Sequence, residues 1–132
     1  MAQAYGIRTT VKTSYDDTIP RVTEALKQEG FGILTQIDVK DTLKKKLNVD
    51  FPKYIILGAC NPPLAHKALS SETEIGLLLP CNVIVYEGKD GQTVVAAQDP
   101  DAALGIVGNP ALAPIAKDAR ERLARVIASL KA

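Results

Sequence analysis

The sequence predicts an α+β fold, a two-layer α/β sandwich in which helices pack on one mixed sheet of about five strands. Three observations predict it. Segments with the composition of strands alternate along the chain with segments of helical periodicity. Residues 81–98 indicate two strands joined by a tight turn, which requires an antiparallel pair. The chain of 132 residues has the length of a single domain, 1–132, with its own hydrophobic core.

The first strand and first helix are expected within residues 5–30. Residues 5–12 alternate and are rich in β-branched side chains, which is typical of a strand. Ser14 and Asp17 resemble a capping box, and apolar residues then recur on one helical face until Gly30 ends the helix. Pro20 lies deeper than the usual first-turn proline. We therefore expect the helix either to begin near Asp17 or to have an irregular first turn.

Two further strands flank a short helix. Residues 31–37 predict the second strand, and Asp38 or Asp41 can cap a helix that runs to Leu47. Apolar residues four apart define the inner face of that helix, and its lysines suit the negatively polarised end. Residues 54–60 are apolar at successive positions. This pattern predicts a third strand that is covered on both faces.

The remaining strands follow a second short helix. Asn61 as cap and Pro62 at the first helical position predict that helix. Pro80 lacks the N–H group that a central strand needs, so we expect the fourth strand to start near Cys81. After a turn, residues 92–98 predict the return strand.

A long C-terminal helix completes the predicted fold. Residues 101–109 suit a loop or a helical turn, and Asn109 with Pro110 repeats the pattern of cap and first-position proline. Apolar side chains form one stripe over 114–130, with charged side chains on the opposite face. We find no internal repeat and no linker.

Composition and charge exclude several classes of partner. The net charge of +1 and the absence of tryptophan argue against a nucleic-acid-binding surface, which needs clustered basic and aromatic side chains. No apolar run is long enough to span a membrane, and the N-terminal residues lack the apolar core of a secretory signal. Two cysteines do not make a disulfide framework. We therefore expect a cytoplasmic protein with reduced thiols.

The distinctive chemical feature is a pair of Cys-Asn dipeptides beside prolines. Cys60 and Asn61 end one predicted strand, and Cys81 and Asn82 begin another. If the two strands are central, the thiols can meet at one end of the sheet. Cys60 precedes a helix N-terminus, which favours a thiolate, but unpaired cysteines are more often small buried apolar residues. Asn61 suits helix capping better than ligand binding.

Other polar residues extend this candidate ligand or thiol site. Pro62 starts the short helix, and His66 lies one turn further on as a possible partner of the thiols. Two cysteines and one histidine leave a zinc site short of ligands, so we assign no metal. Asp38 follows a predicted buried strand, where sites in α/β sheets often lie, although helix capping is its simpler role. We find no phosphate-binding loop and no nucleophile–base motif.

Several of these segments together resemble a known family. The motifs are GFGIL at 30–34, LGACNP at 57–62, LPCNV at 79–83, Asp-Pro at 99–100 and Gly-Asn-Pro at 108–110. In combination they closely resemble the bacterial and archaeal DUF302 family, and the likeness extends over nearly the whole chain. The resemblance implies a small α+β domain that tends to form a homodimer. It implies no established reaction, cofactor or catalytic residue.

Three functional hypotheses follow from these observations. The first is a dimeric module that binds a small ligand or another protein near the two Cys-Asn strand ends. The second is a thiol-dependent redox or metal-handling protein that uses Cys60 and Cys81. The third is an enzyme with a pocket near Asp38 and Asn61, and it ranks last because no catalytic base is evident. The sequence identifies neither a reaction nor a cofactor.

Overall fold

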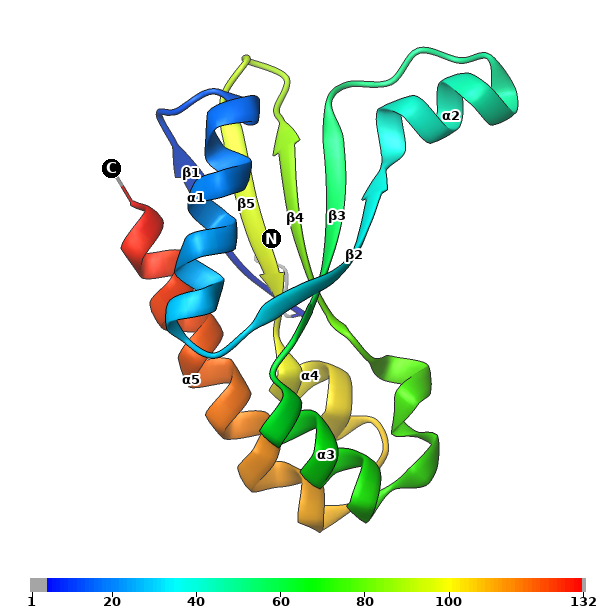
Figure 1. The fold of residues 1–132 in the computed structure, drawn as a ribbon, viewed down its shortest axis with the longest axis vertical. Coiled ribbons are helices and arrows are strands. Elements are labelled where there is room, and N and C mark those ends of the chain that lie inside the picture. The colour runs from blue at the N-terminus through cyan, green and yellow to red at the C-terminus, as the bar shows by residue number, and fades with distance from the viewer. Residues whose placement is uncertain (1–4, 132) are drawn as a thin grey trace.

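The computed structural model describes residues 5–131 as alternating strands and helices around one sheet (Figure 1). It confirms the expected α+β sandwich and the order of its strands and helices. These are β1 (Gly6–Val11), α1 (Tyr15–Gln28), β2 (Gly32–Asp38), α2 (Val39–Leu47), β3 (Tyr54–Cys60), α3 (Pro62–Ser71), the 3₁₀ helix η1 (Thr73–Leu78), β4 (Cys81–Glu87), β5 (Thr93–Gln98), α4 (Pro100–Gly105), the 3₁₀ helix η2 (Pro110–Leu112) and α5 (Ala113–Leu130).

The sheet is antiparallel at every pairing, so the expectation of a mixed sheet is wrong. The strand order is β1-β5-β4-β3-β2, and all four neighbouring pairs run antiparallel. Parallel neighbours require a crossover between strands that lie side by side. Here α1 carries the chain from the β1 edge to the opposite edge, so β1 and β2 do not pair.

The predicted cap of α1 is present, and Pro20 does not interrupt the helix. The Ser14 hydroxyl accepts a hydrogen bond from the Asp17 N–H at 3.1 Å. The helix nevertheless begins at Tyr15, and Pro20 lies inside it with an exposed side chain. Gly30 follows the helix with φ 85°, as its predicted role in helix termination requires.

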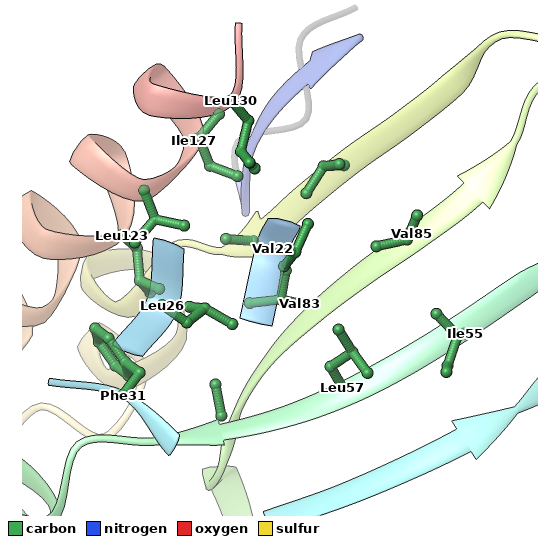
Figure 2. Close-up of a cluster of buried hydrophobic side chains, with 14 of the residues drawn as sticks. Val22, Leu26, Phe31, Ile55, Leu57, Val83, Val85, Leu123, Ile127 and Leu130 are labelled. Atoms are coloured by element: carbon green, nitrogen blue, oxygen red, sulfur yellow. The ribbon is translucent and has the colours of Figure 1, made fainter. Parts of the chain in front are cut away.

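The main hydrophobic core lies between the sheet and the pair of helices α1 and α5. Val22 and Leu26 of α1 and Leu123 of α5 are fully buried against the strands (Figure 2). From the sheet, alternate residues such as Leu57 and Val83 point into the same core. This alternation is the expected consequence of the two-residue period of a strand.

The opposite face of the sheet stays uncovered, which corrects the prediction that β3 is covered on both faces. Among the described helices, only α1 and α5 lie over a sheet face; α2 projects from one end of the sheet, and α3 and α4 lie beyond the other end (Figure 1). The outward-facing residues of the central strands, including Tyr54, Ile56, Ile84 and Tyr86, are half-buried by one another. The apolar residues on both faces of β3 therefore do not mean that helices cover both faces of the sheet.

A second hydrophobic cluster lies beyond the end of the sheet. Ala68 of α3, Ile75 of η1, Leu104 of α4 and Ala116 of α5 are buried together there. α5 is long enough to contribute to both clusters. None of the helices in residues 5–131 is long and apolar enough to cross a membrane.

Candidate functional site

A cavity of about 290 Å³ lies between the two hydrophobic clusters, at the end of the sheet where β3 stops and β4 starts. Phe31 and Ala59 from the main core line one part of it, and Ala68 and Leu104 from the second cluster line another. The lining residues are almost all apolar. They are Phe31, Leu34, Ala59, Cys60, Asn61, Leu64, Ala65, Ala68, Leu69, Gly76, Leu79, Pro80, Cys81, Pro100, Leu104, Ile115 and Ala119.

The two cysteines lie at this cavity, far apart in sequence but on neighbouring strands. Cys81 pairs with Ala59, one residue before Cys60, and both cysteines line the cavity as half-buried free thiols. Burial raises the pKa of the Cys81 thiol to about 11, with a smaller contribution from charge on Cys60. A thiol with a raised pKa stays protonated at neutral pH, so Cys81 is a neutral apolar wall of the cavity.

Asn61 also lines the cavity, but both ends of its amide make hydrogen bonds within the protein. Its Oδ1 accepts from the Leu64 N–H at 3.3 Å, which caps α3 as the sequence predicts. Its Nδ2 donates to the Glu29 carbonyl at 3.3 Å, which ties the start of α3 to the end of α1. Asn61 therefore positions the wall of the cavity and has little capacity left for a ligand.

The other candidate residues lie away from the cavity lining. Pro62 and His66 are exposed on α3, and neither lines the cavity. Asn82 is exposed on β4 opposite Gly58. Asp38 caps α2 by accepting from the Asp41 N–H at 2.9 Å, beside a separate hollow around α2.

These positions bear on the metal hypothesis. His66 is exposed on α3 and is not among the cavity-lining residues that include the thiols. Within residues 5–131, no group of three or more His, Cys, Asp or Glu side chains is arranged to hold a metal ion. The thiol pair therefore has no third ligand among the described residues.

Sequence reasoning missed several residues that shape the cavity. The register between β2 and β3 shifts between Ile33 and Thr35, which leaves Leu34 as a bulge residue that lines the cavity with 68% of its surface exposed. Gly76 lines it from η1, a 3₁₀ helix that the sequence analysis does not predict. A bulge has no clear sequence signal, because it depends on how two strands pair.

Comparison with known proteins places the chain in a family. A family model described as "Domain of unknown function DUF302" matches residues 7–130. The chain belongs to the DUF302 family. Among solved structures, it is similar to an uncharacterized conserved DUF302 protein from Bacillus stearothermophilus, with 36% identity and a TM-score of 0.90. That match covers 97% of this chain and 99% of the other. No curated protein matches the chain.

Proposed function

We propose that the chain is a small-molecule-binding module whose ligand occupies the apolar cavity between the two hydrophobic clusters. The cavity itself is the observation that supports this proposal. Small-molecule sites are typically concave and lined mainly by apolar side chains, as this cavity is. A hollow of about 290 Å³ is close to the lower end of the range for ligand pockets.

The position of the cavity adds a second argument. It separates two clusters of buried side chains, so each cluster has apolar surface that meets no protein partner across the gap. An apolar ligand would supply the missing van der Waals contacts and would connect the two clusters. Ligand binding is therefore expected to stabilise the native state by mass action.

A thermal-shift screen tests the proposal. The native protein is screened against a library of small neutral and charged compounds, and each hit is repeated on the Ala65→Phe variant, in which the new ring occupies the cavity. We expect hits that raise the melting temperature of the native protein and lose this effect in the variant. A screen without such hits, or hits that the variant retains, would overturn the proposal.

We further propose that two copies pair as a homodimer, and α2 supports this. The helix has nine residues and no buried side chain. Helices of this length are marginal in water without tertiary packing. Leu47, the last residue of α2, is 65% exposed, and Val49 and Phe51 in the following loop are 43% and 37% exposed. Phe51 lies close to the uncovered sheet face, because its ring meets the Tyr54 ring edge-on, with 6.2 Å between the ring centroids, and Tyr54 stacks on Tyr86.

Light scattering tests the homodimer. We expect twice the mass of one chain for the native protein and a shift toward the monomer for Leu47→Lys. The matched control is Ile106→Lys, since Ile106 is an exposed apolar residue next to α4, at the other end of the molecule. A monomeric native protein, or equal effects of both substitutions, would contradict this assignment.

The thiol-dependent function remains the alternative proposal, together with the cytoplasmic location that keeps both thiols reduced. Two thiols at one cavity favour it, whereas the raised pKa of Cys81 opposes it. Alkylation rates measured against pH on the Cys60→Ser and Cys81→Ser variants distinguish a thiol-dependent function from cysteines that only line the cavity. If either remaining thiol reacts with a pKa well below the ordinary value of 9.0, the redox or metal-handling function gains support.

A further inference from the structure

We infer that the cavity selects an uncharged aromatic molecule of about two fused rings. This inference rests on the proposed function and names the ligand class for the same site. Three features carry it: the chemistry of the lining, the size of the hollow and the position of its mouth.

The lining offers no partner for a charge. Among the described residues that surround the hollow, none has an ionisable side chain other than the two thiols. Asn61, the one lining residue with a polar amide, already uses both ends of that amide within the protein. Burying an ionised group without a partner costs several kcal/mol, about the whole affinity of a small ligand. The apolar lining therefore disfavours an ionised carboxylate or ammonium group inside the cavity.

The size of the cavity limits the ligand. A dry apolar cavity of about 150 Å³ in an engineered protein holds one benzene molecule. The present cavity has about twice that volume, which suits two fused rings. The thiols of Cys60 and Cys81 lie in its wall, and sulfur makes favourable contacts with aromatic rings. This favours an aromatic ligand over an aliphatic one of the same volume.

The mouth of the cavity lies between β2, α3 and η1. Leu34, Leu69 and Gly76 each line the cavity and are exposed to solvent. A Cβ atom built on Gly76 would lie 4.0 Å from Leu69 Cδ2, which is an ordinary contact. A large side chain at Gly76 can therefore narrow the entrance without a backbone clash, since Gly76 does not have a positive φ angle.

Three compounds with the same ring system but different charge test the inference. They are naphthalen-1-ylmethanol, which is neutral, 1-naphthoate, an anion, and 1-naphthylmethylammonium, a cation. We expect the neutral compound to bind at least about tenfold more tightly than either ion in calorimetric titration. Equal or tighter binding of an ion would overturn the inferred ligand class. If that ion also displaces naphthalen-1-ylmethanol from the protein, the two compounds share the cavity, and the proposed small-molecule-binding function survives. Absence of binding by all three compounds would overturn the inference as well.

Two variants locate the binding site. Gly76→Phe is expected to weaken binding of the neutral compound at least about tenfold by narrowing the mouth. Gly105→Phe is the matched control, because Gly105 is exposed on α4 and its added Cβ meets nothing within 4 Å. Equal affinity for both variants would place the compound elsewhere and overturn the inference.

Protection of the thiols gives a second readout that needs no substitution. Bound naphthalen-1-ylmethanol should slow alkylation of Cys60 and Cys81 by N-ethylmaleimide, as followed by mass spectrometry on the native protein. The protection should follow the same saturation curve as the calorimetric titration. Unchanged alkylation rates at a saturating concentration would contradict binding in this cavity.

Discussion

At the scale of single residues, Gly58 shows how closely the strands approach at the cavity end of the sheet. A Cβ atom at Gly58 would collide with Thr35 Oγ1 and would lie 2.9 Å from Pro80 Cγ. Thr35 faces Gly58 because of the bulge in β2 at Leu34. The glycine therefore permits the pairing that also brings Leu34 to the mouth of the cavity.

Gly58→Ala should destabilise the protein by about 1–3 kcal/mol, the usual cost of forcing extra volume into a packed interior. Chemical denaturation followed by circular dichroism measures the change. Gly32→Ala in the neighbouring strand is the control, because a Cβ there meets nothing within 4 Å. A loss of stability that is equal in the two variants would show that the contact with Thr35 and Pro80 is not the cause.

At the same scale, Asn61 combines two roles in one side chain. It caps α3 through Oδ1 and holds the Glu29 carbonyl through Nδ2. Arg122 Nη1 donates to that same carbonyl at 3.1 Å. The end of α1, the start of α3 and the side of α5 are therefore joined at a single carbonyl oxygen.

Asn61→Ala should lower the free energy of unfolding by about 1–2 kcal/mol through loss of the helix cap. Asn61→Ser keeps a capping oxygen and removes only the amide donor, so it should recover about half of that loss. Urea denaturation of both variants measures the difference. Equal stability of the serine and alanine variants would mean that the cap contributes little.

At the scale of whole elements, α2 and α3 are similar short helices with different environments. Both have a side-chain cap, from Asp38 and Asn61. α3 buries Leu64 and Ala68 beside the cavity, whereas α2 buries no residue. Since short helices depend on packing for stability, α2 is expected to be the less stable of the two helices in a single chain, and a second copy in the proposed homodimer would supply further packing.

Hydrogen exchange tests that difference between elements. Amide protons of α2 should be protected in a concentration-dependent way, because protection would come from the second copy, while those of α3 should be independent of concentration. Mass-spectrometric exchange at two protein concentrations, one on each side of the dissociation constant, measures this. Concentration-independent protection of α2 would contradict its proposed role in dimerisation.

At the scale of the whole molecule, ion pairs connect helices that are distant in sequence. Arg125 of α5 donates to the Glu29 carboxylate after α1, with Nη2–Oε1 at 2.9 Å. The hydrogen bond from Arg125 lowers the pKa of Glu29 below its ordinary value of 4.5. Nearer the middle of α5, Arg120 Nε donates to the carboxylate of Asp99, the cap of α4, at 3.0 Å.

The lowered pKa of Glu29 gives a pH prediction. Because the folded-state pKa is lower than the unfolded-state value, the pair stabilises the fold above pH 4.5, and this contribution is lost as the pH falls through the folded-state pKa. Glu29→Gln should therefore be slightly less stable than the native protein at pH 7 and equally stable at strongly acidic pH. Urea midpoints across this range check it. A stability difference that does not depend on pH would rule out the charge as its source.

The sequence by itself determined the strands and most of the helices and their caps. Ser14, Asn61 and Asn109 were predicted as caps, and each accepts a hydrogen bond at the start of a helix. The Asp99 cap of α4 and the 3₁₀ helix η1 were not predicted. Capping, proline geometry and periodic apolar residues act over a few neighbours, so they can be predicted from local sequence. The presence of both cysteines at one end of the sheet also followed from the two strand ends.

Only the tertiary structure decided the sheet direction, the uncovered face and the cavity. Each depends on contacts between segments distant in sequence, such as Ala59 with Cys81 or Gly58 with Thr35. Apolar residues on both faces of β3 predict that both faces are shielded from water. They do not predict whether a helix, a second copy or a ligand provides that shielding. The cavity exists because α3, η1 and α4 enclose a second cluster that does not meet the first, and no local pattern encodes that gap.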